Sequence, residues 1–123
     1  MTDIWEQIEN DDTDQPLQIA VDPDDTAIFL SREVWQNHIL LRHPEMVDFK
    51  DLIVAAITSP DKREYDVRTP NVIRCYKNVP PERQITASHL KVRVVVKYTQ
   101  PPEREYERTG LISSAYLVRW KVE

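Results

Sequence analysis

The chain of 123 residues contains one glycine and one cysteine, and each scarcity excludes a class of protein. Loops that cradle phosphates or dinucleotides are built from several glycines, so most nucleotide-cofactor folds are excluded and no cofactor is expected. The single cysteine, Cys75, cannot form an internal disulfide, which fits a reducing cytoplasm. No apolar run approaches the roughly 20 residues of a membrane helix, so no membrane partner is expected.

Basic residues are absent from the first part of the chain. Residues 1–10 lack the basic and apolar regions of a signal peptide, which adds to the expectation of a cytoplasmic protein. Residues 1–25 hold nine acidic side chains, which leaves 21 − 9 = 12 acids against all 16 Lys and Arg in the remainder, a net charge of +4. We therefore predict an acidic arm, 1–25, followed by one domain, 26–123, that suits an anionic ligand. A leader that only keeps the domain soluble is the alternative.

The most informative stretch is SREVWQNHILLRHPE, residues 31–45, which holds two of the three histidines. Ser31 is a favourable N-cap. An amphipathic helix is predicted from the side chains that recur at i, i+3 and i+4: Val34, Trp35, His38, Ile39 and Arg42. Because Pro44 restricts His43 to extended backbone, the helix should end near Arg42 or His43.

A second amphipathic helix is predicted after Asp48, which can cap it, and before Ser59 and Pro60, which stop it. Its apolar stripe consists of Phe49, Leu52, Ile53, Ala56 and Ile57. Residues 2–9 are expected to form one or two helical turns. Residues 17–21 form a short apolar segment, and residues 27–30 are expected to lead into the first helix.

After Pro60 the hydrophobic period changes from 3.6 to 2, which predicts strands at residues 63–68, 72–79, 90–99 and 111–122. In the strongest strand, Leu90, Val92, Val94, Val96 and Tyr98 face one way, and Lys91, Arg93, Val95 and Lys97 face the other. The predicted fold class is α+β, with two N-terminal helices packed on a four-strand antiparallel sheet.

Metal ligands are poorly placed in the sequence. His38 and His43 would point about 140° apart on a continuous helix, and Cys75 and His89 lie on other elements. No metal site is expected. Cys75 is interpreted as a small buried residue, with a thiol nucleophile as the alternative.

The polar residues suit metal-free cleavage of RNA, which needs a base for the 2′-OH, an acid for the 5′-oxygen and donors that hold the phosphate oxygens. Histidine is suited to both proton transfers because its unperturbed pKa is about 6.5. The candidates form three groups along the chain: His38, Arg42 and His43; Lys91 and Arg93; and Ser113, Ser114 and Tyr116. For each group a structural role is the alternative: a core histidine, a solvated sheet face, or a strand packed under a loop.

Taken in order, these residues resemble a known family. The motifs between Val34 and Tyr116 are W-x-x-H-I-L-x-R-H-P-E, an apolar helix ending in Ser-Pro-Asp, L-K-V-x-V-V-V and G-x-I-x-S-A-Y. They look like the phage- and mobile-element-associated nucleases of the BECR superfamily, which includes barnase, EndoU, colicin and RelE-like folds. The resemblance implies two helices on a four-strand antiparallel sheet and a metal-independent endoribonuclease, often a toxin.

The resemblance also implies roles for individual residues. His38 or His43 would be the acid or base, Lys91 the phosphate-binding cation, and Ser114 and Tyr116 the hydroxyls near the scissile phosphate. The other residues expected to bind RNA phosphates are Arg42, Arg74 and Arg93. The expected partners are RNA, with tRNA as one candidate, and an antitoxin or immunity protein. The alternatives are a non-catalytic protein-interaction module and an inhibitor whose acidic arm mimics nucleic acid.

Overall fold

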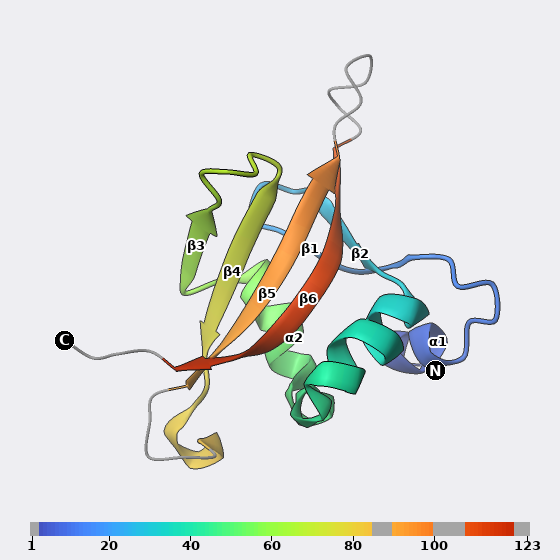
Figure 1. Ribbon diagram of the computed structural model, residues 1–123, viewed down its shortest axis with the longest axis horizontal. Coiled ribbons are helices and arrows are strands. Elements are labelled where there is room, and N and C mark those ends of the chain that lie inside the picture. Colours follow the sequence, from blue (N-terminus) through green and yellow to red (C-terminus); the bar gives the residue numbers. More distant parts are fainter. Residues whose placement is uncertain (1–2, 85–89, 100–107, 120–123) are drawn as a thin grey trace.

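The computed structural model describes residues 3–84, 90–99 and 108–119, and its centre is a six-stranded sheet. The strands run in the order β1-β2-β6-β5-β4-β3 (Figure 1). Their bounds are β1 Leu17–Val21, β2 Ala27–Leu30, β3 Lys62–Tyr65, β4 Val72–Asn78, β5 Leu90–Thr99 and β6 Thr109–Arg119. Neighbouring strands are antiparallel except for β2 and β6, which are parallel.

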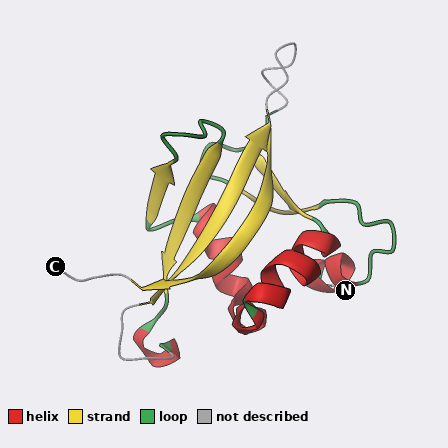
Figure 2. Ribbon diagram, in the orientation of Figure 1, coloured by secondary structure: helices red, strands yellow, loops and turns green. Residues whose placement is uncertain are grey.

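The helical segments gather on one side of this sheet (Figure 2). They are α1 Ile4–Glu9, the π-helix η1 Val34–Leu40, the 3₁₀-helix η2 Pro44–Phe49 and α2 Lys50–Thr58, with a short 3₁₀ turn, η3 Pro81–Arg83, before β5. Among the described residues, none of these helices has the length and apolar character needed to cross a membrane.

The predicted α+β class is confirmed, but the predicted four-strand antiparallel sheet is wrong because the sheet has six strands and is mixed. Residues 17–21 and 27–30, interpreted as an apolar segment and a lead-in, are the strands β1 and β2. Both are short, and β2 finds its parallel partner in β6 at the other end of the chain. Local periodicity carries no information about such a distant pairing.

The helical part also differs from the predicted pair of helices. The second predicted helix is divided into η2 and α2, and Phe49 rather than Asp48 occupies the N-cap position of α2. The apolar residues predicted for this helix and for the inward face of β5 are nevertheless buried, as expected: Phe49, Leu52, Ile53, Ala56, Ile57, Leu90, Val92, Val94, Val96 and Tyr98. They form one core between the helices and the sheet, together with Trp35 and Ile39 of η1.

Gly110, the one glycine of the chain, lies where β2 pairs with β6. A Cβ atom at this position would lie 2.6 Å from Ile28 Cδ1 and 2.8 Å from Val96 Cγ1. Contacts this short would force neighbouring side chains to move, so the close approach of the two strands requires a residue without a side chain.

Residues 1–25, expected to form an acidic arm, do not stand apart from the predicted domain 26–123 where the structure describes them. Trp5 and Ile8 of α1 are part of the core, and β1 is part of the sheet. The ring centroids of Trp5 and Trp35 are 4.7 Å apart. The predicted boundary at residue 25 therefore does not separate two structural units.

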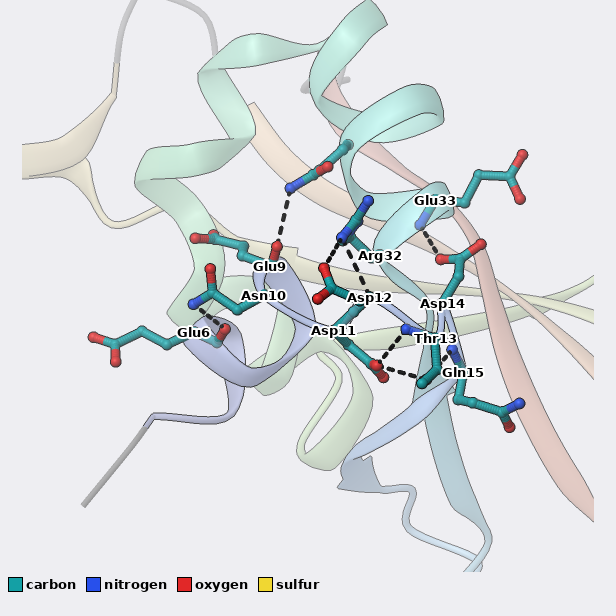
Figure 3. A network of polar contacts seen from close by, with 11 residues as sticks. Glu6, Glu9, Asn10, Asp11, Asp12, Thr13, Asp14, Gln15, Arg32 and Glu33 are labelled. Atoms are coloured by element: carbon teal, nitrogen blue, oxygen red, sulfur yellow. Dashed lines mark hydrogen bonds and ion pairs between the residues drawn. The ribbon is translucent and has the colours of Figure 1, made fainter.

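The acidic side chains of this segment hold it against the start of η1 (Figure 3). The Asp14 carboxylate accepts a hydrogen bond from the Glu33 backbone N–H at 2.8 Å, and Arg32 Nη1 lies 3.4 Å from Asp12 Oδ1. Among the described contacts, five of the nine acidic residues have side chains that contact residues beyond position 25: Glu9, Asp12, Asp14, Asp22 and Asp24. The acidic side chains of residues 1–25 therefore help to attach this segment to the rest of the domain.

Glu9 gives this attachment a predicted dependence on pH. Its carboxylate accepts hydrogen bonds from Lys50 Nζ at 2.8 Å and Trp35 Nε1 at 3.2 Å, and the Lys50 bond lowers the pKa of Glu9 below its ordinary value of 4.5. A carboxylate with a lowered folded pKa stabilises the fold above its unfolded pKa, and this contribution is lost as the pH falls through the folded pKa. In urea unfolding below pH 4.5, wild type should therefore lose stability more steeply than Glu9→Gln. Parallel pH profiles of the two proteins would contradict this expectation.

Candidate functional site

The register of the sheet places two predicted site residues, Arg93 and Tyr116, side by side and next to Tyr76. Tyr76 of β4 pairs with Arg93 of β5, and Arg93 pairs with Tyr116 of β6. Residues directly opposite each other in antiparallel strands share a face. The neighbouring residues Val94 and Ala115 are buried in the core, so the three side chains lie on the opposite face. We call this face of β3–β6, which points away from the helices and the core, the outer face.

Tyr116 reaches the outer face because β6 contains a β-bulge. The register shifts by one residue at Ser113, which is left unpaired between Ile112 and Ser114. Before the bulge Ile112 is buried in the core, and after it Ala115 is buried. In a regular strand, residues four positions apart share a face, so Tyr116 would point inward like Ile112. The bulge reverses this alternation and directs Tyr116 outward.

His43 approaches Tyr116 from the end of the first predicted helix. The N-cap prediction is confirmed, because Ser31 Oγ accepts a hydrogen bond from the Val34 N–H at 3.2 Å. The predicted helix end is also confirmed, since helical backbone stops at Arg42 and His43 has φ −137° and ψ 67° before Pro44.

The position of η1 brings the His43 ring over the edge of the sheet. β2 pairs with β6 only as far as Leu111, so η1 and η2 lie against the rest of this edge (Figure 1). The rings of His43 and Tyr116 are stacked, with centroids 5.3 Å apart and planes at 27°. His43 Nδ1 lies 3.8 Å from the carboxylate of Glu45. An imidazole is therefore fixed beside a phenol on the outer face.

Arg93 connects this pair to the middle of the sheet. Its Nη1 donates a hydrogen bond to Tyr116 Oη at 3.1 Å. The guanidinium carbon lies 5.1 Å from the ring centroid of Tyr76 and 5.4 Å from that of Tyr116, within the range of cation–π attraction. No carboxylate of the described residues forms an ion pair with Arg93. A partly buried cation without a counter-ion favours the binding of an anion.

Arg74, also predicted to bind phosphate, lies on the outer face but has its charge compensated. Its Nε and Nη2 lie 3.0 and 2.8 Å from Glu64 Oε1, and its Nη1 lies 3.2 Å from Asp66 Oδ2. The hydrogen bond from Arg74 lowers the pKa of Glu64 below its ordinary value. Of the two arginines, Arg93 is therefore the better candidate for an anion site.

Two further predicted residues, Lys91 and Ser114, lie on the outer face. Lys91 lies two residues before Arg93 on β5, opposite Val118. Ser114 lies two residues before Tyr116 on β6, and both Lys91 and Ser114 are partly buried. The structure thus places them along the same face, where they extend the polar surface around Arg93.

His38 and Arg42 lie elsewhere. The His38 side chain is 50% exposed, and its Nε2 lies 4.0 Å from Glu33; Arg42 is exposed. The predicted stripe is right for Trp35 and Ile39, which are buried, but wrong for His38 and Arg42. The reason is that η1 is a π-helix with more residues per turn than the α-helix, so the 3.6-residue period does not describe its faces.

Neither Glu64 nor Tyr76 is predicted as a site residue from the sequence. The Tyr76 ring is 1% exposed, so it is not available for stacking. Its hydroxyl donates a hydrogen bond to Glu64 Oε1 at 3.2 Å. The sequence signal that could have found Glu64 is the turn at Thr69, Pro70 and Asn71, because antiparallel pairing of the strands on either side of it places Glu64 opposite Arg74.

Other reactive side chains do not add to this site. Cys75 is buried, and its burial raises the pKa of the thiol, which fits the interpretation as a core residue. In residues 3–84, 90–99 and 108–119, no three His, Cys, Asp or Glu side chains are grouped as metal ligands. His89 lies outside the described residues.

The outer face carries positive charge. On β3–β5 and the turn after β3, the five cations Lys62, Arg74, Lys91, Arg93 and Lys97 face two carboxylates, Glu64 and Asp66, a net charge of 5 − 2 = +3. This surface, with an imidazole and a phenol at one end, can bind an anion and exchange protons with it. Comparison of the chain with protein-family models, with curated proteins and with solved structures finds no match.

Proposed function

We propose that this protein is a metal-independent endoribonuclease with its site on the outer face of the sheet. The observation that carries the proposal is the convergence of His43, Tyr116 and Arg93. They supply a proton acceptor, a hydroxyl and a cation that has no carboxylate partner among the described residues. These are the kinds of group that metal-free cleavage of RNA requires. The BECR-like motifs of the sequence support the same activity.

In this proposal the His43 imidazole accepts the proton of a ribose 2′-OH, whose oxygen attacks the adjacent phosphorus. The bond from phosphorus to the 5′-oxygen breaks, and that oxygen takes the proton of the Tyr116 hydroxyl. Arg93 opposes the negative charge that develops on the phosphate and on the Tyr116 oxygen. The products are a 2′,3′-cyclic phosphate and a 5′-hydroxyl end, and water returns a proton from His43 to Tyr116.

The remaining residues of the outer face would bind the rest of the RNA. Lys91 and Ser114 lie on the same face and suit contacts with neighbouring phosphates. A nuclease that acts as a toxin in the cytoplasm would also require an antitoxin or immunity protein in the cell that makes it. The acidic residues of 1–25 do not act as a nucleic-acid mimic in this function, because five of the nine carboxylates contact residues of the domain.

The test is incubation of the purified protein with total tRNA and with total RNA in EDTA. We expect discrete fragments whose 3′ ends are 2′,3′-cyclic phosphates. The end groups are identified by their resistance to polyadenylation before, but not after, removal of the cyclic phosphate. Intact RNA in both mixtures would contradict the proposal and favour the non-catalytic interaction module.

A further inference from the structure

Tyr76 is unusual among the buried residues because it lies on the outer face rather than in the core. Its ring is 1% exposed, yet it is not part of the core cluster. It is covered by charged side chains, with Arg93 at 5.1 Å on β5 and Lys62 at 6.0 Å on β3, measured to the ring centroid. Its hydroxyl is fixed by the hydrogen bond to Glu64. The ring is therefore held both by packing and at its polar end.

Glu64 accepts the Tyr76 hydrogen bond while its carboxylate is paired with Arg74 rather than with Arg93. Its Oε1 also accepts a hydrogen bond from Arg74 Nε and lies 2.8 Å from Arg74 Nη2, and this ion pair compensates its negative charge. Arg93 in turn packs against the Tyr76 ring on one side and the Tyr116 ring on the other. The contacts thus run from Glu64 through Tyr76 to Arg93, across three neighbouring strands.

The Arg93 side chain is held in position, but not all of its hydrogen-bond donors have a partner among the described residues. Its Nη1 donates to Tyr116, while its Nε is buried and has no hydrogen-bond partner among the described residues. An arginine side chain loses considerable rotamer freedom when it is held in one geometry. Side chains already held in place lose less of this freedom when a ligand binds, which raises affinity.

We propose that Glu64 is a positioning residue, which acts through Tyr76 to hold Arg93 in place for an oxyanion. The chemical class that fits is a phosphate group, because a guanidinium binds tetrahedral oxyanions through paired N–H donors. That this phosphate belongs to RNA rests on the proposed function. The binding of the oxyanion itself can be tested without any cleavage.

The probe is inorganic phosphate, titrated into ¹⁵N-labelled protein while the arginine Nε–H signals are followed by NMR. Arg93→Lys assigns the Arg93 signal by its loss, and in this variant the saturable shifts of the backbone amides near residue 93 should also disappear. Tyr76→Phe removes only the hydroxyl that Glu64 holds, and we expect it to weaken phosphate binding about three- to tenfold, the value of one hydrogen bond. Glu64→Ala should weaken it similarly, while Glu64→Gln, which keeps an acceptor oxygen, should bind close to wild type.

The matched control is Tyr65→Phe, which removes a hydroxyl from an exposed tyrosine on the same strand as Glu64 and should leave phosphate binding unchanged. Wild-type affinity in Tyr76→Phe, or no loss of binding in Arg93→Lys, would overturn the inference. Its failure is distinguishable from that of the nuclease. A protein that binds phosphate as described but leaves RNA intact retains the positioning role and loses the proposed activity. If the protein cleaves RNA but Tyr76→Phe binds phosphate as tightly as wild type, the proposed activity stands and the positioning role of Glu64 is wrong.

Discussion

Replacing His43 with alanine is expected to reduce RNA cleavage about 10²–10⁴-fold, the usual contribution of one positioned acid or base. The reason is that the His43 ring, stacked on Tyr116, is the one imidazole that the described residues place beside Arg93 on the outer face. The measurement is the initial rate of fragment formation in EDTA, for wild type and His43→Ala at equal concentration.

His38→Ala is the matched control for this prediction. The wild-type His38 ring is half-exposed and lies five residues before His43. We expect the His38→Ala variant to cleave RNA at the wild-type rate. Both variants should unfold within about 1 kcal/mol of wild type, as is usual for changes at the surface. Equal losses of activity in the two variants, or cleavage by His43→Ala at the wild-type rate, would remove His43 from the mechanism.

Replacing Asp22 with alanine is expected to destabilise the fold by about 3–5 kcal/mol, the range found when one partner of a buried charge pair is removed. Asp22 is 5% exposed and accepts hydrogen bonds from Tyr98 Oη at 2.7 Å and from the Thr26 N–H at 2.9 Å. Arg63 Nη2 lies 3.6 Å from the same carboxylate. Burial and the bond to Asp22 raise the pKa of Tyr98, so the phenol stays protonated and donates. Without the carboxylate, the Tyr98 hydroxyl would be buried without this acceptor.

Urea unfolding measures this loss, and Asp22→Asn separates its two causes. The asparagine keeps an oxygen that can accept from Tyr98 but removes the charge that faces Arg63, so its stability should lie between those of wild type and Asp22→Ala. A loss below about 1 kcal/mol in Asp22→Ala would show that the network around Asp22 contributes no more than an ordinary surface contact.

Local features of the fold could be predicted from sequence because their causes are local. The Ser31 cap and the break at Pro44 depend on neighbouring backbone, and the alternation of β5 depends on a strand with one buried face. The strands β1 and β2 could not be predicted in the same way, because a parallel pairing with β6 is a property of the whole fold. Asp22 illustrates the same limit. It directly follows β1, but the local sequence gives no sign that the side chain turns inward to Tyr98.

The residues of the candidate site likewise differ in whether local sequence could indicate them. His43, Arg93 and Tyr116 could be named from residue type and motif, and the structure brings them together. Glu64 is not indicated by residue type or motif, because its relation to Tyr76 depends on the register of two paired strands. His38 was assigned to the packed side of its helix because the π-helical geometry of η1 leaves no mark on the hydrophobic period.

The bulge at Ser113 affects how any relative of this protein should be aligned with it. Ile112 and Tyr116 are four residues apart yet face opposite sides of the sheet. A homologue with a regular strand here would be one residue shorter between these two positions. An ungapped alignment would then place a core residue at the position of Tyr116 and hide the site. Only a one-residue gap at Ser113 keeps the tyrosine opposite Arg93.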